Sequence, residues 1–306
     1  MVTRSLTNLS LCTGIAGLEI GLKAVIPIRT ICYVENEVSV AAILAKRMEK
    51  QSFLDEAPIW SDLRTFDADP WRGRVDIVSG GFPCQPFSVA GHRLQENDPR
   101  NLWPDTARLI RRIGSPIVFL ENVPGIIEYY FDTIRPELRA MGYEVTEGLF
   151  SASETGAPHL RQRIFILAHA NSSRSREDWK PSELWTNSTR QPSSNHGTSR
   201  PGEDDEISAE RQYRFESGFP LFPPGPSERK EWDALVKRYP DIDPTVCTEG
   251  HLLTEMSSTE SELCRASNGT PNRMDSRIRL RAIGNAVVPA VAANAFRILS
   301  KTLSSK

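Results

Sequence analysis

Up to about residue 170, short apolar runs alternate with stretches of helical periodicity, and this alternation constrains the fold more than any other feature of the chain. The apolar runs that we interpret as strands are residues 6–12, 30–35, 75–79, 116–120 and 164–168. The stretches between them with helical spacing are residues 18–24, 38–50, 106–113 and 133–141. Alternating strands and helices predict an α/β fold with a mostly parallel sheet. In such sheets, ligands bind at the carboxyl ends of the strands.

The composition changes at Asn171. Residues 171–200 contain eight serines and one aliphatic side chain, so they cannot bury enough apolar surface to offset the entropy of ordering. We expect a long loop or disordered insert over about 171–212, inside a separate domain over 171–275. Residues 228–238 have the spacing of a short helix, and residues 286–299 that of an amphipathic helix with Pro289 in its first turn. The first domain then comprises 1–170 and 276–306.

Charge is distributed unevenly, although the formal total is only −2. Residues 171–272 have a net charge of −6, whereas residues 273–306 have a net charge of +6. A total near zero gives no sign of a nucleic-acid partner. Taken alone, the basic C-terminal segment indicates no more than a solvated entry to a helix.

Composition excludes several classes of protein. Apolar residues make up 39% of the chain and charged residues 25%, the balance of a soluble globular protein. No run of about 18 uncharged apolar residues predicts a membrane span, and residues 9–28 lack the basic leader of a signal peptide. The five cysteines are scattered without a CxxC pair, so we expect neither a disulfide framework nor a metal site. A reducing, intracellular compartment is expected.

The motif with the most chemical content is residues 76–88, which read DIVSGGFPCQPFS. An apolar strand runs into two glycines, which permit a sharp turn, and Cys84 then stands between prolines that stiffen its loop. A thiol held at the end of a strand suits a nucleophile. A lone cysteine, however, is more often an inert buried thiol than a catalytic group.

Two acidic residues follow apolar strands. Glu121 emerges from residues 116–120, where partial burial raises a carboxyl pKa and suits the group to donate a proton. A simple helix cap is the other interpretation of Glu121. Glu35 ends the second strand and follows the small residues of 11–19 (LCTGIAGLE), an arrangement that suits a ribose-containing ligand, although the spacing is not GxGxxG.

Two further segments carry polar groups. Arg161 and Arg163 lie on one side of an extended segment, where they suit a phosphate or the polar edge of a base. Asn285 opens the last helix, where it can cap the helix and touch a ligand.

In this order, the motifs resemble the cytosine-C5 DNA methyltransferase family, over most of residues 6–170 and 277–299. The resemblance implies a Rossmann-like, S-adenosylmethionine-dependent methyltransferase sheet, no metal, and a smaller, irregular target-recognition domain over about 171–275.

The resemblance also implies roles for individual residues. Cys84 matches the nucleophile that attacks cytosine C6. Glu121 matches the acid at N3 and the exocyclic amine, with Asn122 supporting it. The paired arginines of the cytosine and phosphate site match Arg161 and Arg163. The positions that match contacts to S-adenosylmethionine are Leu11, Cys12, Thr13, Gly14, Ile15, Ala16, Gly17, Leu18, Glu35, Asn36, Asp62, Leu63, Pro83, Leu102, Asn285, Ala286 and Val287.

The implied activity is methyl transfer to C5 of a flipped-out cytosine in double-stranded DNA, through a covalent bond between Cys84 and C6. The base that removes the C5 proton is not assigned. The implied setting is restriction–modification, or protection of phage or host DNA, in the cytoplasm of a bacterial or phage-infected cell. We expect a monomer with a cognate restriction endonuclease as partner. Three alternatives stay open: a tRNA cytosine-C5 methyltransferase, an inactive DNA-binding regulator, and a thiol redox enzyme, which would want a second cysteine near Cys84.

The chain departs from the family pattern at several positions. Cys12 stands where the family usually has Phe, Ala16 where it has Gly, and His159 where it has Gln. The arginine-rich block that normally precedes the final GN motif is not found. We expect the acidic segment 171–272 to face away from DNA, and the basic segment 273–306, with the two arginines, to form the wall of a DNA cleft.

Overall fold

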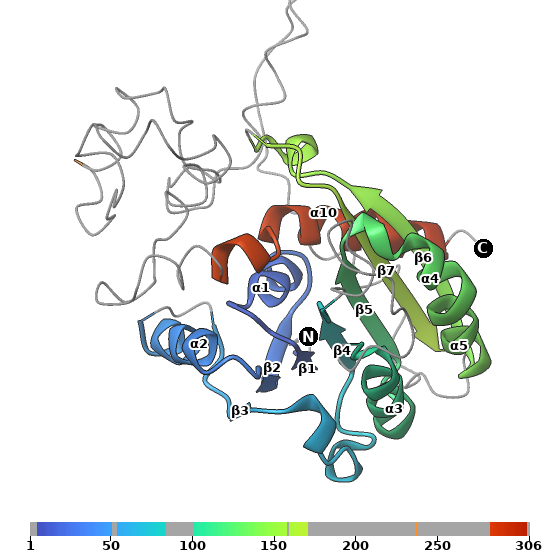
Figure 1. The fold of residues 1–306 in the computed structure, drawn as a ribbon, viewed down its shortest axis with the longest axis horizontal. Coiled ribbons are helices and arrows are strands. Elements are labelled where there is room, and N and C mark those ends of the chain that lie inside the picture. Colours follow the sequence, from blue (N-terminus) through green and yellow to red (C-terminus); the bar gives the residue numbers. More distant parts are fainter. Residues whose placement is uncertain are drawn as a thin grey trace, which may run out of the picture.

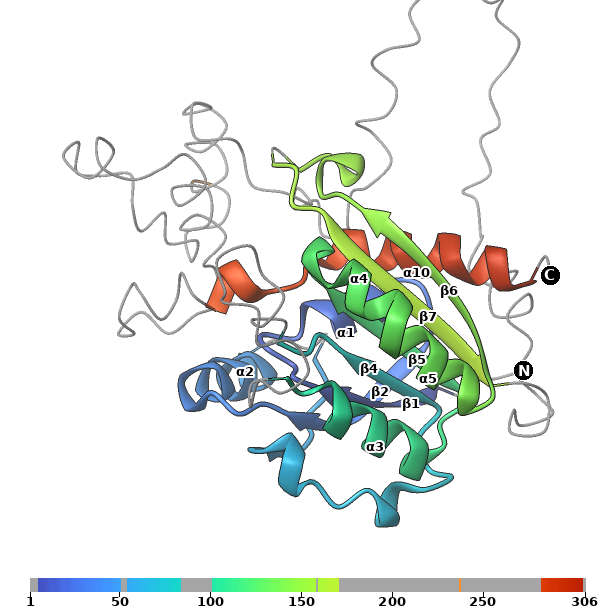
Figure 2. The same cartoon turned by 45° about the vertical axis from the view of Figure 1, so that its right-hand side comes forward.

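A computed structural model describes residues 5–50, 54–83, 101–157, 159–170, Lys237 and 282–304. Within them, seven strands form one sheet in the order β3-β2-β1-β4-β5-β7-β6 (Figures 1 and 2). The first five run parallel to their neighbours, whereas β7 is antiparallel to both β5 and β6. The strands are β1 Leu6–Leu11, β2 Ile28–Val34, β3 Ile59–Trp60, β4 Ile77–Gly80, β5 Ile117–Asn122, β6 Tyr143–Phe150 and β7 Arg163–Ala170. The predicted α/β fold with a mostly parallel sheet is confirmed.

Helices cover both faces of the sheet. On one face, α1 and α10 pack together in a core with the apolar side chains of β4, β5 and β7, and α2 lies beside them against β2. On the other face, α3 and the α4–α5 segment pack in the larger core. The α4 helix continues through a π-helical turn, Tyr130–Ile134, into α5. The helices are α1 Gly17–Lys23, α2 Val38–Lys50, α3 Trp103–Ile113, α4 Ile127–Tyr129, α5 Arg135–Ala140 and α10 Pro289–Ser304.

The central strands are apolar because helices cover them on both sides. All six residues of β5 and all four of β4 are buried. A strand covered on both faces is expected to be a continuous apolar run rather than an alternating one. Glu121, near the carboxyl end of β5, therefore lies directly after the apolar residues of the strand, at the edge of the core.

The antiparallel pair β6 and β7 was only half predicted. The run that became β7 was expected as a strand, but β6 was not, because Thr146, Glu147 and Gly148 interrupt its apolar pattern. These polar residues are tolerated since β6 is the edge strand. The two-residue strand β3 was also not predicted, and it is too short to show a period.

The C-terminal helix returns the chain to the sheet. Pro289 is its first residue, where the missing N–H has no helical partner in any case. The segment Ala282–Ser304 is long and apolar enough for a membrane span by length and composition, although Arg297 and Lys301 interrupt it, and 44% of its most apolar window is buried inside the protein. The buried side, with Val291, Ala295 and Leu299, packs in the core with α1, as in a core helix of a globular protein.

The predictions for residues 171–275 lie outside the described residues, apart from Lys237, which is helical as expected. They stay predictions.

Candidate active site

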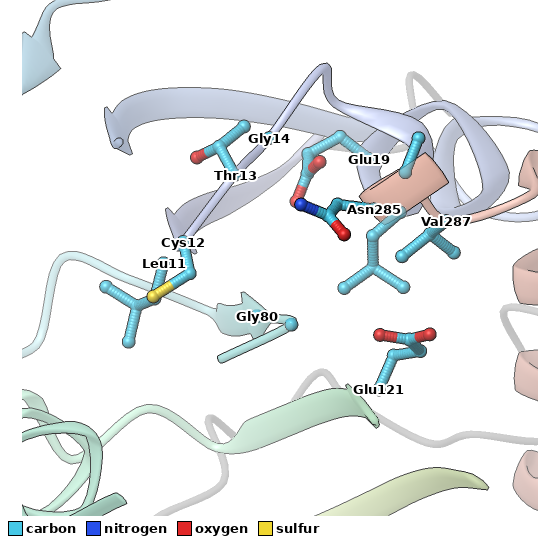
Figure 3. A pocket seen from close by; sticks show the side chains of 12 residues that line it. Leu11, Cys12, Thr13, Gly14, Glu19, Gly80, Glu121, Asn285 and Val287 are labelled. Carbon is cyan, nitrogen blue, oxygen red and sulfur yellow. The ribbon is translucent and has the colours of Figure 1, made fainter. Parts of the chain in front are cut away.

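A pocket opens at the carboxyl ends of β1 and β4. The strand order places these two strands side by side, with β2 and β3 on one side and β5 on the other, so the connections leave β1 and β4 in opposite directions. Such a switch point leaves a crevice where α/β proteins bind ligands. The side chains of the pocket come from four parts of the chain (Figure 3). They are Leu11, Cys12, Thr13, Gly14, Leu18, Glu19, Gly80, Gly81, Glu121, Asn285, Ala286 and Val287.

The loop after β1 forms one wall of the pocket, and Glu35 from the end of β2 fixes its shape. The Gly14 N–H donates to Oε2 of Glu35 at 2.7 Å, and the Glu37 N–H donates to Oε1 at 2.9 Å. Gly14 has φ +59, and Ala16 has φ +67. A non-glycine residue in this left-handed region costs roughly 1–2 kcal/mol, which explains why glycine suits the position that Ala16 occupies.

The C-terminal segment forms the opposite wall. A Cβ added to Gly17 at the start of α1 would lie 2.0 Å from the carbonyl oxygen of Val287, so only glycine allows this approach. The Arg161 guanidinium Nη2 also donates to the carbonyl oxygens of Gly284, at 2.8 Å, and Ala286, at 2.7 Å. These contacts place Asn285 in the pocket, more than 120 residues along the chain from Arg161.

Glu121 lies at the end of β5 and is 8% exposed. Its Oε1 forms an ion pair with Nε of Arg163 at 3.0 Å. Burial raises the pKa of Glu121 above its ordinary value, and the charges of Arg163 and Arg161 oppose the shift without cancelling it. The raised pKa, expected from the sequence, suits a group that donates a proton.

Asn122, the neighbour of Glu121, contacts the segment that follows β4. The Asn122 side-chain amide donates to the carbonyl oxygen of Phe82 at 2.9 Å, and so ties the end of β5 to the segment after β4. Cys84 itself lies outside the described residues, which resume at Asn101. Its role as nucleophile therefore stays a prediction.

Burial disfavours the thiolate form of the two cysteines that the structure describes, Cys12 and Cys32. Burial raises the pKa of Cys12 to about 12, with the charge of Glu35 adding to the shift, and burial raises that of Cys32 to about 11. Both thiols are thus protonated at neutral pH, whereas a nucleophilic cysteine must form a thiolate. Within the described ranges no three His, Cys, Asp or Glu side chains gather as metal ligands, and the expected absence of metal stays a prediction.

The structure brings together many of the predicted site residues, but not all of them. Nine line the pocket, namely Leu11, Cys12, Thr13, Gly14, Leu18, Glu121, Asn285, Ala286 and Val287. The others lie around it or farther away and do not line it, namely Ile15, Ala16, Gly17, Glu35, Asn36, Asp62, Leu63, Pro83, Leu102, Arg161 and Arg163. Asp62, for example, caps a short helical turn by accepting a bond from the Arg64 N–H. Their roles in binding stay predictions.

Sequence reasoning missed three residues of the pocket: Glu19, Gly80 and Gly81. A signal for Glu19 was present, because it is the one acid in the apolar stretch GLEIGL that opens α1. The sequence predicts a turn at Gly80 and Gly81, but it does not place them in the pocket. A Cβ on Gly81 would lie 3.1 Å from Oε2 of Glu121, so the small residue leaves room beside that carboxyl group.

Comparisons with known proteins point to one family. Residues 6–217, more than half of the chain, match the model of the C-5 cytosine-specific DNA methylase family. The type II methyltransferase M.NgoMIV of Neisseria gonorrhoeae is 31% identical over 169 residues, which cover 54% of this chain and 52% of the relative. M.HgiCII of Herpetosiphon aurantiacus, another type II methyltransferase, is 34% identical over 165 residues, 52% of this chain and 36% of the relative. The matches thus span about half or less of the relatives' length.

The fold has a solved counterpart over nearly all of the chain. The crystal structure of a DNMT2 mutant from Spodoptera frugiperda aligns with a TM-score of 0.58 and 16% identity, covering 96% of this chain and 99% of that one. The likeness supports the same arrangement of sheet and helices.

Proposed function

The chain belongs to the C-5 cytosine-specific DNA methylase family, and from this premise we propose that it methylates C5 of a flipped-out cytosine in double-stranded DNA. One observation carries the proposal: Glu121, a buried acid with a raised pKa, lines the same pocket as the loop after β1. Glu121, which can donate a proton to the cytosine, thus lies in the crevice between β1 and β4, where the strand order predicts ligand binding.

The family uses S-adenosylmethionine, and the pocket fits this group. Gly80 lines the pocket and has no side chain to fill it, and it lets β4 lie close to β1, because a Cβ there would lie 3.0 Å from the carbonyl oxygen of Leu11. The loop residues 11–14 and the C-terminal residues 285–287 would hold the group between them. When bound, it supplies an electrophilic methyl group.

The residues of the chain then activate the cytosine. The thiolate of Cys84 adds to C6 and forms an S–C6 bond, while Glu121 gives its proton to N3 and so prevents negative charge from building up on the ring. Carbon 5 becomes enamine-like and takes the methyl group. A base removes the C5 proton, the S–C6 bond breaks and Cys84 leaves as a thiolate, and N3 returns its proton to Glu121, so that the product is neutral 5-methylcytosine. Arg163 holds the Glu121 carboxyl group through the 3.0 Å ion pair.

We further propose that residues 1–170 and 276–306 form the catalytic domain and residues 171–275 the target-recognition domain. The packing of α10 against α1, β6 and β7 supports a single catalytic unit made from both ends of the chain. The biological setting we favour is restriction–modification or protection of phage or host DNA, since relatives are type II methyltransferases.

The proposal is tested by expressing the chain in methylation-free cells and mapping 5-methylcytosine in their DNA by bisulfite sequencing. We expect methylation at a defined sequence, and none with Cys84→Ala. Purified protein should form a covalent complex with duplex DNA containing 5-fluorocytosine in the presence of S-adenosylmethionine. Transfer to tRNA but not to DNA would overturn the substrate assignment. DNA binding without transfer or covalent trapping would indicate an inactive regulator.

A further inference from the structure

Glu19 is a buried acid of the pocket that the proposed mechanism does not use. It reaches from α1 into the space that Asn285 enters from the C-terminal segment (Figure 3). The residue is 1% exposed. One carboxyl oxygen, Oε1, accepts a bond from the Ser79 hydroxyl at 2.8 Å. The other, Oε2, is buried and has no hydrogen-bond partner among the described residues.

An orphaned carboxyl oxygen in a pocket needs a physical explanation. Burying an acid without a full set of partners costs several kcal/mol, and such groups are rare in folded proteins. Burial also raises the pKa of Glu19, and the hydroxyls of Ser10 and Ser79 oppose the shift only in part. The described residues place no cation against Glu19 to neutralise it. A hydrogen-bond donor that a ligand brings into the pocket would supply the missing partner, and a cationic donor would also neutralise the carboxylate.

We propose that Glu19 binds the α-ammonium group at the methionyl end of S-adenosylmethionine. This inference rests on the proposed function and extends it. The ammonium group is the cationic N–H donor of that molecule, since its sulfonium carries no N–H, and the α-carboxylate would be repelled by Glu19. The side-chain amide of Asn285, which enters the same space from the C-terminal segment (Figure 3), has donors that suit the α-carboxylate.

The position of Glu19 agrees with this assignment. The bond from the Ser79 hydroxyl holds Glu19 against the end of β4, the strand next to β5, which carries Glu121, whereas Glu35 follows β2 on the other side of β1. The methionyl end must lie near the site of transfer, because it carries the reacting methyl group. Glu19 is thus on the side of the crevice formed by β4 and β5, where transfer is proposed, and Glu35 is on the side formed by β2, where the ribose would lie.

The test measures binding rather than methyl transfer. Isothermal titration compares S-adenosylhomocysteine with its deaminated analogue, in which hydrogen replaces the α-ammonium group. The wild-type protein should bind S-adenosylhomocysteine about 10- to 100-fold more tightly, the range expected for a hydrogen bond to a charged group. Glu19→Gln should reduce this ratio to within about threefold, while binding of the deaminated analogue stays close to the wild-type value. The matched control is Glu56→Gln, at an exposed position, which should leave the ratio unchanged.

A second variant keeps the inference testable if Glu19→Gln does not fold. Glu19→Met replaces the buried acid with an apolar side chain of similar length and so removes the cost of burying an incompletely bonded carboxyl group. It should erase the preference for the ammonium group as well. Equal binding of both ligands to the wild-type protein would overturn the inference. A ratio that persists in the two Glu19 variants would also overturn it. An equal loss of affinity for both ligands in these variants would show that Glu19 has a purely structural role, and would overturn the inference too. Failure of the wild-type protein to bind S-adenosylhomocysteine at all would instead overturn the proposed function with it.

Discussion

Among single residues, Glu121 carries the clearest functional prediction. Glu121→Gln keeps the size of the side chain and a hydrogen-bond donor, but it cannot transfer a proton to N3. We expect turnover to fall by about 10²-fold or more, the scale of a lost general acid. Single-turnover transfer to duplex DNA measures the chemical step directly. Rates equal to those of the wild-type protein would show that proton donation by Glu121 is not required.

The raised pKa of Glu121 also predicts how stability depends on pH. Because the folded protein holds this proton more tightly than the unfolded chain, the free energy of unfolding falls as pH rises from the ordinary value of 4.5 through the folded pKa. Urea denaturation at a series of pH values should therefore show the wild-type protein losing stability relative to Glu121→Gln over this interval. The opposite trend would mean that the ion pair with Arg163 outweighs burial and depresses the pKa.

Between elements, the approach of α1 to the C-terminal segment predicts a coupled loss of stability and binding. In Gly17→Ala the new Cβ would lie 2.0 Å from the Val287 carbonyl oxygen, so the segment that carries Asn285 must move. We expect a loss of roughly 1–3 kcal/mol in unfolding free energy, the usual cost of overpacking, and at least tenfold weaker binding of S-adenosylhomocysteine.

The control for this change is Gly142→Ala, at a position with φ +90 and open space around it. It should cost about 1 kcal/mol through backbone conformation alone and leave ligand affinity unchanged. Equal affinity in the Gly17→Ala protein would show that the position of the C-terminal segment does not control the pocket.

The same elements show how much of the fold and of the candidate site the sequence predicts. Helix α2 has the predicted bounds, 38–50, and the acids at the ends of β2 and β5 were recognised because parallel strands end at one edge of a sheet. The edge strand β6 was missed, since an edge needs no continuous apolar pattern. The bonds from Arg161 to Gly284 and Ala286 join parts of the chain that no local pattern relates. Glu19 was missed because an acid on a helix is usually solvated, and only packing shows that this one is not.

For the whole molecule, the uneven distribution of charge bears on DNA binding. The total of −2 would weigh against a DNA-binding protein, but affinity depends on local positive charge rather than on the sum. We propose that the basic segment 273–306 contacts phosphates, since it holds Arg277, Arg279 and Arg281 close together in the sequence and leads into the segment that lines the pocket.

Changing these three arginines to glutamine should therefore reduce the salt dependence of DNA binding. Each phosphate contact contributes about 0.9 to the slope of log K against log salt concentration, so the slope should fall in magnitude by up to about 2.7. The matched control changes Arg29, Arg72 and Arg74, which are exposed near the amino ends of β2 and β4, away from the pocket. Fluorescence anisotropy with duplex DNA from 50 to 300 mM salt gives the slopes. If both triple variants keep the wild-type slope, the basic segment makes no phosphate contacts. If the two slopes fall equally, DNA binding is not confined to the side of the molecule that holds the pocket.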